Sequence, residues 1–129
     1  MDMGLTFLEA ISSWSRAMET RNLTDFELML ADGFEWHSMN SQGHMTRADT
    51  IGWVRSTDMR IGNFKMLHDG EDVVCGTHSV FEEGKDETIV MCVIVLGDDR
   101  NQVKTWSITR ANFYHNAETN NNPELGYFL

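Results

Sequence analysis

The stretch Thr88-Ile-Val-Met-Cys-Val-Ile-Val-Leu96 is the longest apolar run in the chain. It has the length of one strand, and its Val and Ile residues favour extended backbone. Alternate residues of a strand point to opposite faces of a sheet, and here both sets are apolar. Turn-forming residues bound the run at 83–85 and 97–101. The run therefore predicts a strand whose two faces are both covered.

Further strands are expected on either side of this run. Residues 72–82 alternate between two sets of side chains, as a half-buried strand does. Asp69-Gly70 is a hairpin signal, and it separates 72–82 from an extended segment at 59–68. Residues 103–114 form the last expected strand. Together these segments predict an antiparallel meander.

Three helices are expected before the meander, over about residues 4–20, 24–31 and 46–57. Apolar residues spaced by four, three and four positions form the buried stripe of the first helix. This stripe consists of Phe7, Ile11, Trp14 and Met18. Thr24 with Glu27, and Thr46 with Asp49, have the spacing of helix N-terminal caps, and Gly33 is expected just beyond the end of the second helix. Helices followed by a meander predict an α+β domain.

Composition excludes several classes of protein. The 129 residues hold 10 Lys and Arg against 20 Asp and Glu, a net charge of −10. Nucleic acids and anionic membranes need basic surfaces, so neither is an expected partner. No apolar run approaches the roughly 20 residues of a membrane span. The start, Met1-Asp2-Met3-Gly4, has no basic and apolar leader pattern, so we expect no signal peptide and a cytoplasmic location.

The order of elements over about residues 5–114 resembles the nuclear-transport-factor-2-like superfamily, in its SnoaL-like and ketosteroid-isomerase-like branch. The residues that carry the resemblance are Trp14, Leu23, Leu30-Ala31-Asp32, Phe34-Glu35-Trp36-His37-Ser38, Gly43 and Thr46-Arg47. The resemblance implies one SnoaL-like domain over 1–129, with a polar tail at 115–129. It also implies a cone-shaped, cystatin-like fold, in which three N-terminal helices pack on a curved antiparallel sheet around an apolar pocket.

The resemblance to ketosteroid isomerases can be followed position by position. Their oxyanion-donating tyrosine falls on Trp14, their general-base aspartate on Ser38 and their protonated aspartate near Cys92. A tryptophan N–H still donates a hydrogen bond, but a serine of ordinary pKa is no base and a thiol is a weak donor. Steroid isomerisation by that mechanism is therefore not expected.

The resemblance also implies a set of pocket residues. The expected lining is Trp14, Phe34, Trp36, Trp53, Thr77, Cys92, Trp106, Ile108 and Arg110, with Cys75, Ser79, Val90 and Ile94 on the same faces. The tryptophans either line a site for a flat apolar ligand or fill the cone.

Three polar residues of this region leave alternatives open. Arg110 could hold an anionic oxygen of a ligand, or pair with a carboxylate such as Asp32 or Glu35. His37 and Ser38 are the catalytic candidates. His37 is the better acid–base group, although an ideal strand turns it outward. His78 is expected on the opposite face from Thr77, where it would serve packing.

The two cysteines are expected to be reduced and buried. A two-residue turn at Glu83-Gly84 would make Cys75 and Cys92 cross-strand neighbours, and a longer loop would offset them by two residues. The spacing of His and Cys matches no metal motif, so we expect neither a metal nor a cofactor.

The sequence thus favours a pocket protein that binds, and could transform by proton transfer or cyclisation, a small apolar oxygenated molecule. One alternative is a non-catalytic dimeric association or ligand-binding module, and another is cargo binding. An open cavity of at least about 300 Å³ would favour the first function, and a filled cone the second. The doubly apolar strand at 88–96 predicts a homodimer through the sheet face, unless the C-terminal tail covers that face.

Overall fold

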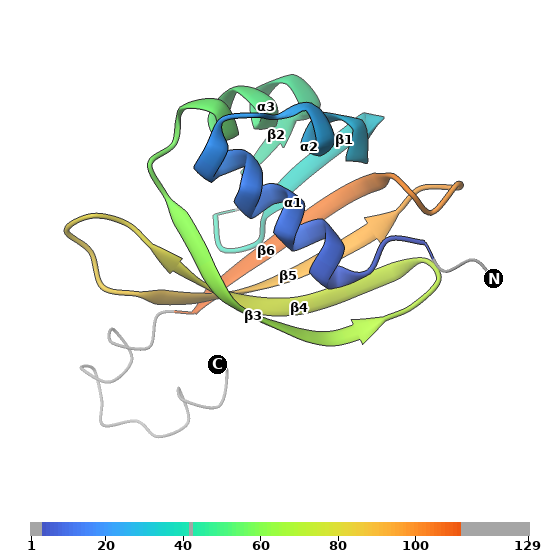
Figure 1. Cartoon of the computed structure of the whole chain (residues 1–129). Coiled ribbons are helices and arrows are strands. Elements are labelled where there is room, and N and C mark those ends of the chain that lie inside the picture. Colours follow the sequence, from blue (N-terminus) through green and yellow to red (C-terminus); the bar gives the residue numbers. More distant parts are fainter. Residues whose placement is uncertain (1–3, 42, 112–129) are drawn as a thin grey trace.

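The computed structural model of the chain describes residues 4–41 and 43–111 (Figure 1). The expected polar tail at 115–129 lies outside these residues. The helices are α1 (Phe7–Thr20), α2 (Thr24–Met29) and α3 (Arg47–Ser56). The strands are β1 (Leu30–Ser38), β2 (His44–Thr46), β3 (Arg60–Asp69), β4 (Val73–Phe81), β5 (Thr88–Leu96) and β6 (Val103–Ala111). No helix among the described residues is long and apolar enough to cross a membrane.

The strands form one curved sheet in the order β2-β1-β6-β5-β4-β3, and the helices lie on one side of it (Figure 1). This arrangement confirms the expected α+β class. The sheet is not wholly antiparallel, because β1 pairs in parallel with β6. His44–Thr46 forms the short strand β2, which pairs with β1 in antiparallel fashion.

Irregular pairing in β3 contributes to the curvature of the sheet. The register between β3 and β4 shifts twice, and Asn63 at the first shift has a left-handed backbone with φ of 54°. Such bulges bend a strand and increase its twist. The bent sheet leaves a concave face, and the helices cover it.

The helix caps differ in part from those expected. Thr46 accepts a hydrogen bond from the Asp49 N–H at 3.2 Å, which confirms the cap of α3. The cap expected at Thr24 was wrong, because Thr24 is already helical and Leu23 before it has no side-chain acceptor. Gly33 lies within β1 and not after a helix, because the second helix ends at Met29.

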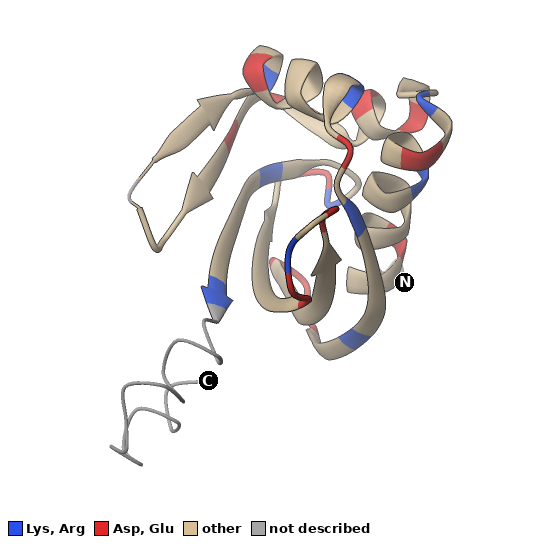
Figure 2. Ribbon diagram, turned by 90° about the vertical axis from the view of Figure 1, so that its left-hand side faces the viewer, with Lys and Arg blue, Asp and Glu red and all other residues tan. Residues whose placement is uncertain are grey.

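The apolar stripe of α1 is buried as predicted. Phe7, Ile11, Trp14 and Met18 are all at most 1% exposed. Charged residues lie elsewhere: Figure 2 shows Asp and Glu along the helices and in turns, whereas most of the strand ribbon belongs to uncharged residues. The interior between α1 and the sheet is therefore apolar, and any polar group in it stands out.

Candidate functional site

The strand register decides which side chains enter the cone. Across β4, β5 and β6, residues that lie opposite one another share a face. Three such rows have buried or half-buried side chains beneath the helices. They are Val74, Ile94 and Trp106; then Gly76, Cys92 and Ile108; then His78, Val90 and Arg110.

The face assignment predicted for 73–81 was therefore wrong. Thr77 pairs with Met91 on the outer face of the sheet, and it is not on the wall of the cavity beneath the helices. Cys75 lies opposite Val93 and not opposite Cys92, so the two thiols are on opposite faces. The cause is the loop between β4 and β5, which is not the expected two-residue turn. The register of β4 against β5 therefore differs by one residue from the register that such a turn would give. A shift of one residue exchanges the two faces of a strand.

Four tryptophans occupy the inner end of the cone. Trp36 stacks on Trp106 with ring centroids 5.2 Å apart. Trp14 meets both edge-on, at 5.0 Å from Trp36 and 5.4 Å from Trp106. Trp53 of α3 lies 5.8 Å from Trp36 and is only partly buried. Aromatic packing thus fills much of the space that a ligand would need.

A cavity of about 80 Å³ remains beside this cluster. Its lining is Trp14, Trp36, Met45, Trp53, Met59, His78, Val80, Val90, Ile108 and Arg110. Pockets for drug-sized ligands measure about 300–1,000 Å³, so this cavity suits a much smaller molecule or the end of a larger one.

The residues predicted from the sequence divide into three groups around the cavity. Trp14, Trp36, Trp53, Ile108 and Arg110 are on its wall. Phe34, Cys92 and Trp106 are buried in the core and are not on the wall. The catalytic candidates His37 and Ser38 are not on the wall either.

His78 is the polar residue that sequence reasoning missed. It is 1% exposed, and its Nδ1 lies 3.1 Å from the Ser79 carbonyl oxygen. A carbonyl oxygen only accepts, so Nδ1 carries the proton and Nε2 of the neutral ring has a free lone pair. That Nε2 is buried without a hydrogen-bond partner among the described residues. The length of the loop between β4 and β5 would have to be known to place His78, because the register between these strands decides which face of β4 points inward.

The environment of His78 favours its neutral form. Burial lowers the pKa of the imidazole below its usual 6.5, and the positive charge of Arg110 lowers it further. The hydrogen bond to Ser79 opposes these effects but does not outweigh them. The ring is therefore uncharged at neutral pH, and its Nε2 is a buried acceptor without a partner among the described residues.

Trp14 supplies a matching donor beside His78. The two rings meet edge to face, with centroids 5.4 Å apart and planes at 87°. The Trp14 indole N–H is buried and has no acceptor in the described part of the chain. Buried polar groups are nearly always hydrogen-bonded, so two unpartnered nitrogens on residues that line one apolar cavity make it a candidate place for a ligand or water.

Arg110 is at the edge of this cavity, and its charge is already paired. Its Nη1 lies 3.6 Å from Oε1 of Glu82, and both side chains are about one third exposed. An ion pair was one of the two alternatives for Arg110, but the partner is Glu82 rather than Asp32 or Glu35. The backbone of Arg110 also exchanges two hydrogen bonds with the Asn40 side chain.

His37 lies on the outer side of the β1–β2 hairpin. Its Nε2 is 3.1 Å from Oε1 of Glu35, and its ring stacks on His44 at 6.1 Å. Ser38 is half-buried and donates its backbone N–H to Gly43. Among the residues described, no three His, Cys, Asp or Glu side chains gather as a metal site would require. Burial raises the pKa of the Cys92 thiol to about 12, so this thiol is neither a nucleophile nor a ready metal ligand.

Solved structures share this architecture. A nuclear-transport-factor-2-like protein of unknown function from Cytophaga hutchinsonii matches at 15% identity with a TM-score of 0.67, covering 86% of this chain and 95% of its own. The chain has the nuclear-transport-factor-2-like fold. A candidate ketosteroid isomerase from Kribbella flavida matches at 14% identity and a TM-score of 0.67, over 80% of this chain and 76% of its own. A candidate polyketide cyclase from Xanthomonas campestris matches at 12% identity with a TM-score of 0.63, over 84% of this chain and 91% of its own.

No protein-family model and no curated protein matches the sequence. The nuclear-transport-factor-2-like fold is therefore recognised through its shape. A fold hosts many activities, so the function has to be argued from the cavity.

Proposed function

We propose that the protein binds a small, apolar, oxygenated molecule in the cone and transfers a proton on it, with His78 as the base. The observation that carries this proposal is the buried, unpartnered Nε2 of His78 on an apolar cavity. A neutral imidazole in such a place can take a proton from carbon next to a carbonyl group.

The neighbours of His78 suit the charge that this reaction creates. When the proton leaves, negative charge develops on the carbonyl oxygen. The Trp14 N–H is a free donor for that oxygen, and Arg110 adds positive potential from the edge of the cavity. The presence of an isomerase and a cyclase by name among proteins of the same fold agrees with proton-transfer chemistry, but only at the level of the fold.

The proposed base is not at the position that the resemblance implies. Ser38 is not on the cavity, and His37 points its Nε2 to Glu35. His78, on β4, takes their place. The reaction class is kept, while the residue that performs it changes.

The test is exchange of the α-hydrogens of 2-butanone in D₂O, followed by proton NMR. We expect the protein to exceed the buffer rate and the His78→Phe variant to lose about 100-fold or more of that excess. The matched control is His37→Phe, which removes a histidine outside the cavity and should keep the rate. Exchange no faster than buffer, or equal exchange by His78→Phe, would contradict the catalytic role.

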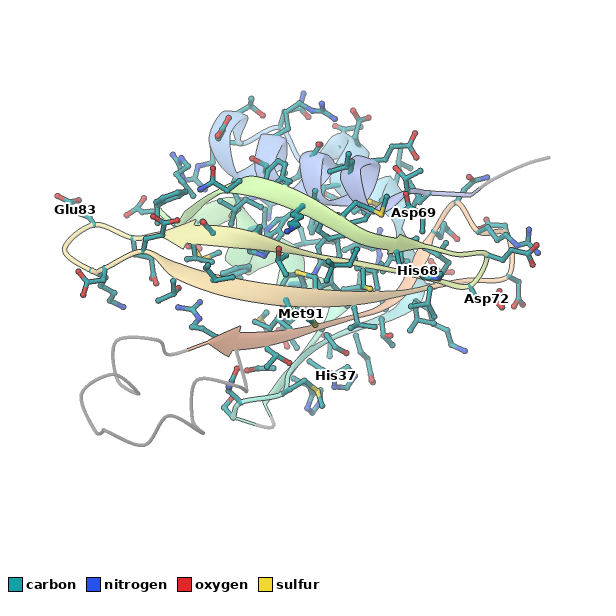
Figure 3. All side chains as sticks on the ribbon, turned by 90° about the horizontal axis from the view of Figure 1, so that it is seen from below. His37, His68, Asp69, Asp72, Glu83 and Met91 are labelled. Atoms are coloured by element: carbon teal, nitrogen blue, oxygen red, sulfur yellow. The ribbon has the colours of Figure 1, made fainter. Side chains whose placement is uncertain are left out.

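A second candidate function is a non-catalytic dimeric association or ligand-binding module. Two observations favour it: the cavity is far smaller than 300 Å³, and tryptophans fill the cone. In addition, Ile89, Met91 and Val93 of β5 are 37–42% exposed on the outer face. Figure 3 looks onto this face, with Met91 labelled on it. A second copy of the chain is the proposed cover. Ligand binding without exchange would select this function.

A further inference from the structure

We infer that the cavity selects a neutral ligand with a hydroxyl group, and that Glu82 keeps carboxylates out. This inference rests on the proposed function, because it assumes that the cavity beside Trp14 and His78 takes a ligand. The substrate of the proton transfer is a carbonyl compound, and a neutral hydroxyl compound occupies the same place without reacting. Glu82 is the residue that determines specificity against carboxylates.

Two nitrogens on residues of the cavity wall lack a hydrogen-bond partner among the described residues. Nε2 of His78 accepts a hydrogen bond, because Nδ1 carries the proton that goes to Ser79. Nε1 of Trp14 only donates. One hydroxyl group can satisfy both, since it donates through its proton and accepts through its lone pairs. An ether lacks the donor, and a hydrocarbon lacks both groups.

The charges around the cavity disfavour an anionic ligand. His78 and the aromatic wall carry no charge at neutral pH, and burying a carboxylate among them without a partner is costly. The cation on the cavity wall is Arg110, whose Nη1 is 3.6 Å from Oε1 of Glu82. Oε2 of Glu82 is also 3.7 Å from Nζ of Lys85. An anionic ligand would have to displace Glu82 from Arg110, whereas a neutral ligand leaves the pair intact.

The volume of the cavity limits the size of the ligand. A cavity of about 80 Å³ has room for about four or five heavy atoms. Isobutanol and its isomer isopropyl methyl ether have five heavy atoms, and isobutyrate has one more. The alcohol carries a hydroxyl group, the ether an ether oxygen and isobutyrate a carboxylate, and their skeletons are otherwise nearly the same.

The experiment is a titration of the protein with each of these three probes, followed by the NMR signals of the tryptophan indole N–H groups. We expect isobutanol to bind about tenfold more tightly than the ether, the effect of one hydrogen bond. Isobutyrate should bind more weakly than either. The Trp14 signal should move most with isobutanol.

Two variants test the named residues. His78→Phe should remove the preference for isobutanol over the ether. Glu82→Gln should strengthen isobutyrate binding about fivefold or more, because it frees Arg110 for the carboxylate. The matched control is Glu83→Gln, which makes the same charge change at the tip of the β4–β5 turn (Figure 3) and should leave all three affinities unchanged.

The outcomes separate this inference from the proposed function. Equal binding of isobutanol and the ether, or stronger binding of isobutyrate by the wild type, overturns the inference while ligand binding stands. An unchanged isobutyrate affinity in Glu82→Gln overturns the role of Glu82. If none of the probes moves an indole signal, ligand binding itself fails and the inference fails with it.

Discussion

His78 decides the chemistry of the cavity at the scale of single residues. Its Nδ1 is held by Ser79, its Nε2 is free, and Trp14 covers its ring. Arg110 is the cation that shares its row of the sheet. The resemblance implied Trp14 and Arg110 as pocket residues, and both line the cavity. It could not show His78, because a histidine flanked by Thr77 and Ser79 belongs to either face of a strand until the register is known.

The stability of the fold should depend on pH through His78. Burial and Arg110 hold its pKa below 6.5 in the folded protein, whereas the unfolded chain takes up a proton near 6.5. Below that pH the unfolded state binds more protons, so the free energy of unfolding falls as the pH falls. The slope reaches at most about 1.4 kcal/mol per pH unit. Urea unfolding between about pH 5 and 7.5 measures it.

The variants for this measurement are His78→Phe and His37→Phe. The first should show a shallower loss of stability toward low pH than the wild type, since its titrating group is gone. The second should follow the wild type. Identical slopes in the wild type and His78→Phe would show that His78 titrates normally in the folded protein.

At the scale of elements, the helix α1 and the strand β4 fit together through Gly76. A Cβ at this position would clash with the Phe7 ring and with the Lys65 carbonyl oxygen. The apolar stripe of α1 was readable from the sequence because helical spacing is regular over several turns. The faces of β4 were not, because they depend on the length of the 82–87 loop, and turn residues such as Glu83-Gly84 allow several lengths.

Gly76→Ala should therefore destabilise the protein by about 1–3 kcal/mol, the usual cost of overpacking a core. The matched control is Gly52→Ala in α3, where an added Cβ meets nothing within 4 Å. That change should stabilise the helix slightly, because Ala is the better helix former. Urea unfolding of both variants measures the difference. A Gly76→Ala variant as stable as the wild type would contradict the close approach of α1.

At the scale of the whole molecule, element order predicted the fold, and long-range pairing limited that prediction. Three helices and a meander indicated a cone, and the helices do cover one side of a curved sheet. The parallel pairing of β1 with β6 joins segments about 70 residues apart in the sequence, and no local sequence pattern indicates this pairing. The small volume of the cavity likewise depends on how four tryptophans pack together.

We expect the protein to be a dimer through the outer face of the sheet. Light scattering at micromolar concentration should give about twice 14.8 kDa. Val93→Asp should give the monomer mass, because an unpaired carboxylate at an apolar interface is costly. Leu28→Asp introduces the same charge at an exposed apolar residue of α2, and it should leave the dimer intact. A wild-type monomer would contradict the proposed interface.

The most direct test of the central claim is NMR of the two imidazole nitrogens of His78 at neutral pH. The structure predicts a neutral ring with the proton on Nδ1 and an unprotonated Nε2, and a change at Nε2 when isobutanol is added. The His78→Phe variant assigns the signals. A proton on Nε2, or an Nε2 signal that no probe moves, would contradict the account of the cavity as a binding site built around a free base.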